Sequence, residues 1–241
     1  MGYKNSAAWF QRCLQRILQL LIYKGIIQYI DDTLLYGKDE TELLDRLEEY
    51  FDILLKHNVK LHPGKFTLFS RRLKWCGKEV SEDGIKPDED RVAAARDMPE
   101  PSDLAELMSF VYGVAWFRNH LPRFAEVAAP LYDLWKDTLA NYQKKTKTRA
   151  KKFKLEDLDG WKKGGREAFA AVKQAMVEAL RTTFFDPDLK TCVFSDASVE
   201  FWCLVITQCK AGDERLPWDE QAGKHRLLAL KSGRFRHSQY R

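Results

Sequence analysis

Apolar side chains recur every three or four residues in six stretches of the chain, the spacing of one face of an α-helix. These stretches are residues 2–23, 40–57, 88–97, 102–117, 124–135 and 161–180. Pro99 and Pro101 separate two of them, because proline cannot continue a helix and restrains its predecessor. We expect Ser102 to cap the following helix. Three short helices with corners at prolines predict a small bundle between residues 88 and 135.

Other stretches are rich in β-branched and aromatic residues and are short enough for strands. Residues 26–30 and 33–36 flank Asp31-Asp32, which predicts a hairpin with both acids at its tip. Residues 66–69 follow a Pro-Gly turn and predict another strand, and so do residues 191–196 and 201–208. Helices and strands together indicate the α+β class.

The composition is that of an ordinary globular protein. The 241 residues are 45% hydrophobic and 31% charged, which suits one large or two small domains. The net charge of +5 favours polyanionic partners without specifying them. No stretch approaches the roughly 20 apolar residues of a membrane span, and the first residues lack the pattern of a signal peptide. We therefore expect an intracellular protein that is not secreted and has no membrane partner.

The cysteines point away from a disulfide framework. Five are present, and no two of them form a Cys-x-x-Cys pair. They are expected to be buried thiols of a reducing compartment rather than a disulfide frame or a zinc site. The five are Cys13, Cys76, Cys192, Cys203 and Cys209.

The chemistry of the chain centres on Asp31 and Asp32. Two carboxylates on one tight turn can share a pair of hard cations, as in-line phosphoryl transfer requires. Aspartate also favours turns for a simpler reason, because its side chain bonds its own backbone. The residues around the pair favour the first interpretation. Tyr29-Ile30-Asp31-Asp32 between apolar strands resembles the metal-binding hairpin of reverse transcriptases, which usually reads Tyr-x-Asp-Asp.

A second resemblance to reverse transcriptases precedes the hairpin. Gly2, Asn5, Phe10 and Gln11 match the family segment Phe-Gly-Leu-x-Asn-Ala-Pro-x-x-Phe-Gln, and Ala8 replaces its proline. In the family this segment lies beside the templating base and the incoming nucleotide.

Two further matches follow the hairpin. The resemblance places Lys65 near the triphosphate, although a lysine after a Pro-Gly turn is usually only solvated. Trp75-Cys76-Gly77 stands where the family has the Phe-Leu-Gly of its primer grip. Bulky Trp75 is otherwise typical of a core.

The middle of the chain resembles the thumb of gypsy-type long-terminal-repeat retrotransposon polymerases. The matching pieces occur in the family's order and spacing, so their succession is specific although each alone is weak. They are Gly84-Ile85-Lys86-Pro87, Pro99-x-Pro101, Ser109-Phe110-x-x-Gly113, Trp116-Phe117-Arg118, Pro122-x-Phe124 and Ala129-Pro130-Leu131.

The last hundred residues combine a basic stretch with a second acidic position. Residues 141–154 are rich in lysine and arginine, which predicts either a solvated linker or contacts to duplex phosphates. Asp196 resembles the first metal-binding carboxylate of a retroelement RNase H domain. Phe201-Trp202-Cys203 replaces the Gly-x-Gly usual there, and residues 232–240 resemble the segment before that domain's catalytic glutamate.

The resemblance implies a partial right-hand polymerase palm with a helical thumb, followed by a truncated RNase H-like α/β domain. The implied domains are residues 1–80 (partial palm, without fingers and first catalytic strand), 81–136 (thumb), 137–190 (basic linker and connection) and 191–241 (RNase H-like). It further implies Mg²⁺, or Mn²⁺, at Asp31, Asp32 and Asp196. The implied partners are an RNA template, a DNA primer, an RNA–DNA hybrid and dNTPs, in the cytoplasm or in virus-like particles.

The expected function is that of a fragment of a retrotransposon reverse transcriptase with RNase H. The family holds its metals with a further aspartate on an earlier strand, for which this sequence offers no match. The RNase H resemblance likewise retains Asp196 but not that domain's glutamate and later aspartates. We therefore expect the 241 residues alone neither to extend primers nor to cut hybrids. Two alternatives remain, a non-catalytic nucleic-acid-binding remnant or host-recruited protein, and a structural protein that only shares the fold.

Overall fold

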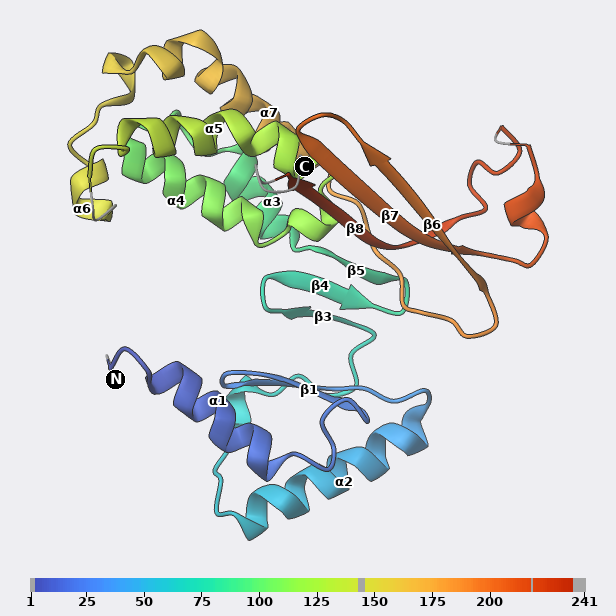
Figure 1. Cartoon of the computed structure of the whole chain (residues 1–241). Coiled ribbons are helices and arrows are strands. Elements are labelled where there is room, and N and C mark those ends of the chain that lie inside the picture. Colours follow the sequence, from blue (N-terminus) through green and yellow to red (C-terminus); the bar gives the residue numbers. More distant parts are fainter. Residues whose placement is uncertain (1–2, 143–145, 218, 236–241) are drawn as a thin grey trace. The chain divides into compact units, whose positions relative to one another are not determined.

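The computed structural model describes residues 3–142, 146–217 and 219–235 (Figure 1). It divides into two compact units, residues 1–76 and residues 77–241. Each unit contains both helices and strands, as the α+β class requires.

Unit 1 packs two helices against a short β-hairpin. Its core consists of Leu18, Leu21, Ile26, Tyr50 and Leu54. The hairpin and the helix predicted at residues 40–57 are both confirmed. The elements, in chain order, are α1 (Ser6–Ile17), β1 (Ile26–Tyr29), β2 (Asp32–Leu35), α2 (Glu40–Lys56), the 3-10 turn η1 (Pro63–Lys65) and β3 (Arg72–Trp75).

Helix α2 carries its own start and stop signals. The Asp39 side chain caps it by accepting a hydrogen bond from Glu42 N at 2.8 Å. Glu40 and Glu42 lie in the first turn and Lys56 in the last, and these charges oppose the helix dipole. The helix buries Tyr50 and Leu54, so local signals and packing agree.

The strand predicted at residues 66–69 is wrong. No strand forms there, and Phe69 has a φ of 52°, which lies outside the β region. The ring of Phe66 instead packs against Phe51 of α2, with 6.2 Å between ring centroids. A contact distant in sequence thus overrides local β propensity.

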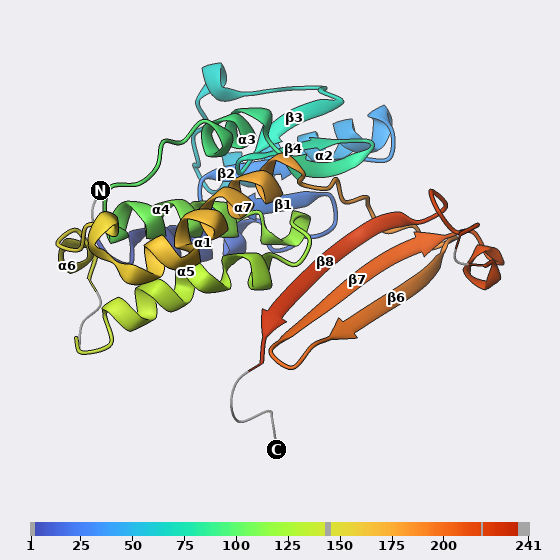
Figure 2. The same ribbon diagram turned by 90° about the horizontal axis from the view of Figure 1, so that it is seen from above.

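Unit 2 joins a helical bundle to an antiparallel sheet. Helices α4, α5 and α7 lie side by side, and β6, β7 and β8 form a separate layer (Figures 1 and 2). The elements are β4 (Lys78–Ser81), β5 (Gly84–Pro87), α3 (Glu89–Arg96), α4 (Leu104–Ala115), η2 (Arg118–His120), α5 (Phe124–Thr138), α6 (Lys147–Ala150), η3 (Leu155–Asp157), the π-helical segment η4 (Trp161–Gly165), α7 (Arg166–Val177), β6 (Lys190–Ala197), β7 (Phe201–Cys209), η5 (Asp213–Arg215) and β8 (Arg226–Arg234).

The bundle confirms the helices predicted from apolar spacing, with one correction at a cap. Asp103, not Ser102, caps α4, and its Oδ1 accepts hydrogen bonds from Ala105 N and Glu106 N, each at 2.9 Å. Ser102 instead donates to the Glu106 carboxylate through its N and its Oγ. In the described residues, no helix has the length and apolar character that crossing a membrane requires.

The basic stretch is not a free linker. Ala150 and Leu155 are buried in the bundle core, and Leu104 N donates to Phe153 O at 3.0 Å. Four of its lysine side chains are exposed, as expected for solvated charges, whereas Arg149 is partly buried. These exposed residues are Lys147, Lys151, Lys152 and Lys154. Lys144 and Lys145 lie outside the described residues.

The sheet confirms the strands predicted at residues 191–196 and 201–208 and adds β8. Strand β8 is held to α5 by two contacts. Ala125 N donates to Ser232 Oγ at 3.0 Å, and Arg234 pairs with Asp133 at 2.8 Å. Of the segment 232–240 that resembles the approach to a catalytic glutamate, residues 236–240 lie outside the described part.

His120 ties the bundle to the segment after α7. Its Nδ1 donates to Leu180 O at 3.0 Å, and Leu180 N donates to His120 O at 2.8 Å. Burial lowers the pKa of His120, and the positive charge of Lys78 lowers it further, against the opposing effect of the hydrogen bond to Leu180. Neutral His120 is therefore the form that the fold stabilises.

Acidification is expected to destabilise unit 2 through His120. The folded pKa lies below the ordinary 6.5, so the unfolded chain binds the proton first as the pH falls below that value. The free energy of unfolding therefore decreases as the pH falls further, and this decrease stops once the pH is below the pKa of His120 in the folded state. Urea unfolding at neutral pH and at about pH 5 should show a smaller loss for His120→Gln than for the wild type. His57→Gln, at an exposed position, is the control, and an unchanged pH dependence in His120→Gln would contradict the prediction.

Candidate metal-binding hairpin

The turn between β1 and β2 has an unusual backbone. Tyr29 pairs with Asp32, so the loop consists of Ile30 and Asp31 alone. Ile30 has a φ of 54°, whereas Asp31 is not among the residues with positive φ. This is the pattern of a type II′ turn, in which the first loop residue is usually glycine. A β-branched residue in that conformation is strained, and such strain gathers at functional sites.

Two glutamine side chains hold the strained residue. Ile30 N donates to Gln11 Oε1, and Gln28 Nε2 donates to Ile30 O. Gln11 Nε2 in turn donates to Gln28 Oε1 at 2.7 Å. Both backbone polar groups of Ile30 are thus satisfied by a closed network that joins α1 to the hairpin, and Gln28 is buried. The network fixes the turn that carries the two aspartates.

Asp31 and Asp32 are both exposed at the tip of this turn. Adjacent carboxylates with fixed backbones offer oxygen ligands of the kind that Mg²⁺ and Mn²⁺ prefer. Among the described residues, no third histidine, cysteine or acidic group joins them within 4.8 Å. The two carboxylates could therefore supply only part of a ligand set for divalent cations within the described residues.

Replacing Gln11 with alanine is expected to lower the stability of the hairpin by about 1–2 kcal/mol, because the Ile30 N–H loses its acceptor. Gln15→Ala is the control, since Gln15 lies exposed on the same helix. Hydrogen exchange of residues 26–36 measures the effect. Equal exchange in the two variants would show that the network does not hold the turn.

The other predicted site residues in and before α1 make no hydrogen bond to the hairpin among the described interactions. Phe10 is exposed, and Asn5 precedes α1 without a side-chain capping hydrogen bond. Gly2 lies outside the described residues. The structure brings Gln11, but not Phe10 or Asn5, into hydrogen-bond contact with the hairpin among the described interactions.

Two further predicted site features follow helix α2 in the sequence. They are Lys65 and the Trp75-Cys76-Gly77 turn. Lys65 ends η1 and is exposed. Cys76 and Gly77 have φ values of 51° and 75°, and two successive positive values are typical of a type I′ turn. Trp75 Nε1 is buried and has no hydrogen-bond partner among the residues that the structure describes. Among the described residues of unit 1, no hydrogen bond or ion pair joins Lys65 to Asp31 or Asp32.

Asp196 belongs to unit 2 and lies near the end of β6. It is exposed, faces Cys203 across the strands, and accepts a hydrogen bond from Ala197 N at 2.9 Å. The pKa of Arg123 is raised, first by its hydrogen bond to Glu126 and to a smaller extent by the charge of Asp196. Arg123 therefore lies within electrostatic range of Asp196, a cation that sequence reasoning did not single out.

The bulky residues that replace the usual glycines are accommodated across the sheet. Trp202 pairs with Gly233 of β8, and a Cβ at Gly233 would lie 2.6 Å from the Trp202 ring. Phe201 receives the guanidinium of Arg234 at 5.5 Å. The neighbouring strand, rather than β7 itself, thus provides the space for Trp202.

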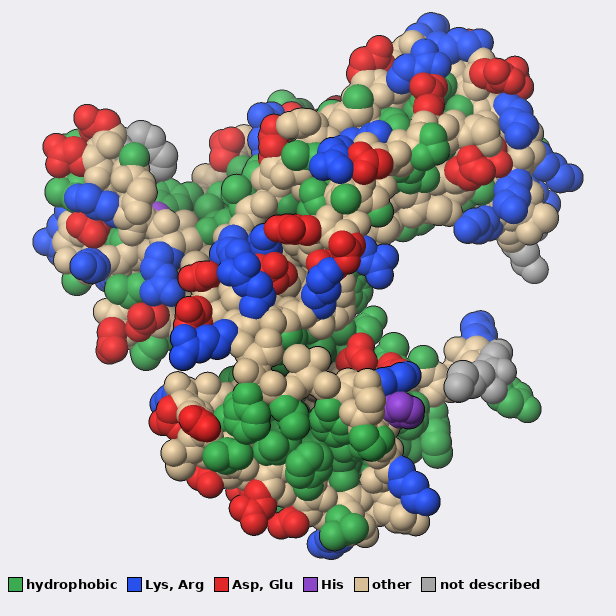
Figure 3. Space-filling model, turned by 180° about the vertical axis from the view of Figure 1, so that it is seen from behind, with side chains coloured by type: hydrophobic (Ala, Val, Ile, Leu, Met, Phe, Trp, Pro, Cys, Tyr) green, Lys and Arg blue, Asp and Glu red, His purple; other side chains and the backbone are tan. Residues whose placement is uncertain are grey.

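Charged and apolar side chains gather on different parts of the surface. Lysine and arginine side chains cluster around the part of unit 2 that carries α6, with acidic residues between them (Figure 3). Unit 1 instead shows a broad area of hydrophobic side chains (Figure 3). The large exposed apolar residues between Glu40 and Ser70 are Leu44, Phe51, Leu55, Leu61, Phe66, Leu68 and Phe69.

Comparison with known proteins finds reverse transcriptases and retrotransposon polyproteins among the relatives of this chain. Residues 1–80 match the family described as "Reverse transcriptase (RNA-dependent DNA polymerase)". The chain is 32% identical over 130 residues to the "Retrovirus-related Pol polyprotein from transposon 297" of Drosophila melanogaster, covering 54% of this chain and 12% of the relative. It is 28% identical over 135 residues to that of transposon gypsy from the same organism, covering 56% of this chain and 13% of the relative. The chain thus spans only a small part of these relatives.

Solved structures share the fold. A foamy viral protease-reverse transcriptase in complex with dsDNA superposes with a TM-score of 0.68 at 20% identity, covering 99% of this chain and 44% of that one. The same kind of protein in complex with an RNA/DNA hybrid gives a TM-score of 0.69 at 20% identity, covering 98% and 28%. At this identity the match describes the fold alone.

Proposed function

We propose that this chain, whose residues 1–80 belong to the reverse transcriptases, is part of a gypsy-type retrotransposon Pol polyprotein that copies RNA into DNA. One observation carries the proposal. The turn at Ile30 is strained, is locked by Gln11 and Gln28, and carries the adjacent, exposed residues Asp31 and Asp32. A strained turn fixed by a closed network is difficult to explain as a simple connection between strands.

The chemistry of the proposed site follows from its carboxylates. When bound, two divalent cations would stabilise the attacking primer oxygen and the leaving pyrophosphate. The role of Asp31 and Asp32 is to hold those cations in place, and the network at Ile30 fixes the backbone of the turn that carries them. Mg²⁺ and Mn²⁺ both suit carboxylate oxygens.

The remaining roles rest on the resemblance. Gly2, Asn5, Phe10 and Gln11 would face the template and the incoming dNTP, and Lys65 would face the leaving group. Trp75, Cys76 and Gly77 would contact the primer end, and Asp196 would hold a cation for RNase H. The domains would be palm (1–80), thumb (81–136), connection (137–190) and RNase H-like domain (191–241).

The site requires more ligands than this chain groups together. In the described residues, two carboxylates stand at the turn without a third. We propose that residues outside the 241 complete the site, so that the chain alone binds a primer–template without extending it.

Primer extension on an RNA template tests the function. The Pol polyprotein that contains these residues is expected to extend the primer with Mg²⁺ or Mn²⁺, and the 241 residues alone are not. A polyprotein that folds and binds the primer–template without extending it would contradict the polymerase proposal. Robust extension by the 241 residues would contradict the incomplete site only.

A second candidate, a non-catalytic nucleic-acid-binding protein, is favoured by the basic stretch. Its lysines are exposed on a segment whose Ala150 and Leu155 are fixed in the core. Cations on a fixed scaffold suit duplex phosphates. Hybrid binding that falls steeply with salt, and that weakens when Lys151 and Lys152 become glutamine, would support it. If binding does not change with Mg²⁺ or with Asp31→Asn, and the polyprotein does not extend primers, the non-catalytic binding protein is favoured over the polymerase.

A further inference from the structure

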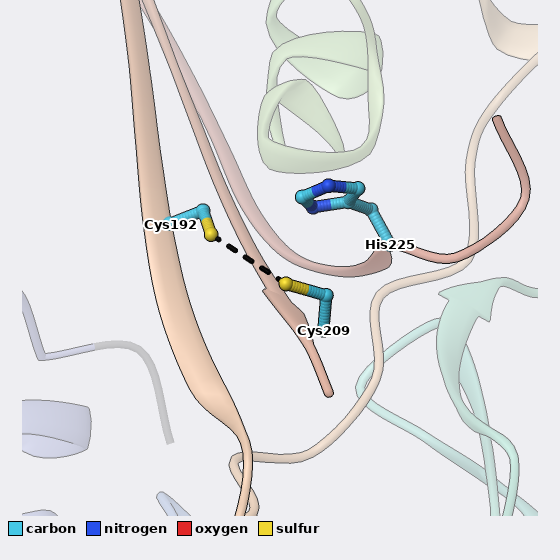
Figure 4. A group of neighbouring side chains, drawn as sticks. All are labelled: Cys192, Cys209 and His225. Carbon is cyan, nitrogen blue, oxygen red and sulfur yellow. Dashed lines mark hydrogen bonds between the residues drawn. The ribbon is translucent and has the colours of Figure 1, made fainter. Parts of the chain in front are cut away.

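One end of the β6–β7–β8 sheet gathers three soft side chains. Cys192 on β6, Cys209 at the end of β7 and His225 just before β8 lie close together (Figure 4). The strand register explains why the two cysteines lie close together. Cys192 lies opposite Thr207, and opposite residues of an antiparallel pair share one face of the sheet. Cys209 follows Thr207 by two residues and therefore points to that same face.

The spacing of these side chains suits a tetrahedral metal site. The two Sγ atoms are 3.7 Å apart, and the nearest ligand atoms of all three residues lie within 4.8 Å of one another. Zinc–sulfur bonds of about 2.3 Å at tetrahedral angles place two thiolates roughly 3.8 Å apart. The observed separation is therefore that of two ligands of one ion, and it is too long for a disulfide, which needs about 2.05 Å.

The hydrogen bonds of His225 select its tautomer. Its Nε2 lies 3.1 Å from Gln221 Oε1, and its Nδ1 lies 2.8 Å from Thr207 Oγ1. Gln221 presents Oε1 because its Nε2 already donates to Leu216 O at 2.8 Å. Nε2 of His225 therefore carries the hydrogen, and the lone pair of Nδ1 accepts from the Thr207 hydroxyl, a hydrogen bond that a metal ion bound at Nδ1 would replace.

The surroundings leave room for a fourth ligand. Thr207 and His225 also line a cavity of about 410 Å³, together with Phe194, Val205, Gln221, Ala222 and Gly223. The ring of Phe194 stands edge-on to that of His225, with 5.6 Å between centroids, and limits its rotation. Among the described residues, no further histidine, cysteine or carboxylate joins the group, so water from the cavity would take the fourth position.

We propose that Cys192, Cys209 and His225 bind a thiophilic divalent cation, with Zn²⁺ as the best fit. The cation would join β6, β7 and the segment that leads into β8. This site is separate from the proposed polymerase function and would exist in a chain without nucleotidyl transfer. Because metal bound only by the folded state stabilises it, Zn²⁺ would also raise the stability of unit 2.

Cobalt titration of the full chain, reduced and stripped of metal, tests the proposal. Wild type is expected to bind one Co²⁺ per chain with a thiolate-to-cobalt charge-transfer band in the near ultraviolet, and Zn²⁺ should displace it. Cys192→Ser and His225→Gln should each lose the band or weaken binding strongly. Gln221→Leu, which removes the acceptor for His225 Nε2 together with the hydrogen bonds to Glu214 O and Leu216 O, should weaken binding by about 10- to 100-fold.

Matched controls separate the site from other thiols. Cys203→Ser changes another cysteine of β7 and should keep the band, and circular dichroism confirms that each variant is folded. The absence of a band in folded, fully reduced wild type would overturn the proposal. A band that persists in folded Cys192→Ser and His225→Gln would overturn it as well.

Discussion

Replacing Asp31 with asparagine is expected to lower primer extension by about a thousandfold or more in a Pol polyprotein that contains this chain. The cations contribute several kcal/mol of transition-state stabilisation, and each 1.36 kcal/mol corresponds to a factor of about ten in rate. Asparagine has nearly the shape of aspartate but lacks its charge. The expected loss is therefore in kcat, measured at saturating template and dNTP.

The fold of the hairpin should survive this change. Asp31 is exposed, and the turn is held through the backbone groups of Ile30 by Gln11 and Gln28. Asp52→Asn provides the matched control, because Asp52 is an exposed aspartate of α2 in the same unit. Activity within a few fold of wild type in Asp31→Asn would refute the metal-binding role of the hairpin.

The sequence was sufficient for elements whose signals are local. The hairpin at Asp31-Asp32 follows from two short β-prone runs around a turn, and helix α2 follows from one apolar stripe. Strands β6 and β7 were visible for similar reasons. The two exposed carboxylates were identified because adjacent acids between apolar strands are a compact pattern.

What the sequence could not show depends on contacts between distant residues. The closed network of Gln11 and Gln28 joins a helix to a turn, and neither glutamine has a periodicity that reveals it. The failed strand at residues 66–69 depends on packing against Phe51. The choice of Asp103 over Ser102 as a cap is a shift of one residue that only geometry decides.

The cysteines show the same limit. They were expected to be buried, but only Cys209 is, and the other four are partly exposed. Spacing rules for zinc search for Cys-x-x-Cys along the chain, whereas Cys192 and Cys209 meet across two strands through the register of β6 and β7. Strand register therefore carries information that residue spacing does not.

Replacing Gly84 with alanine is expected to destabilise unit 2 by about 3 kcal/mol or more, a large part of a typical stability of about 5–15 kcal/mol. Gly84 has a φ of 124°, a conformation that residues with a Cβ rarely adopt. A Cβ there would also lie 1.9 Å from Thr182 O, a backbone atom that cannot move aside as a flexible side chain can.

The contact that Gly84 permits fixes β5 against the segment after α7. Ile85 N donates to Thr182 O at 2.7 Å, and Thr182 N donates to Ile85 O at 2.8 Å. Relief of the clash would move β5 away from the segment at Thr182. Hydrogen exchange should therefore accelerate at the amides of Ile85 and Thr182 before the rest of the bundle opens. Gly113→Ala is the control, because this exposed glycine of α4 has open space around it and alanine favours helix by up to about 1 kcal/mol. Equal stability of the two variants would mean that close backbone approach at Gly84 does not hold the unit together.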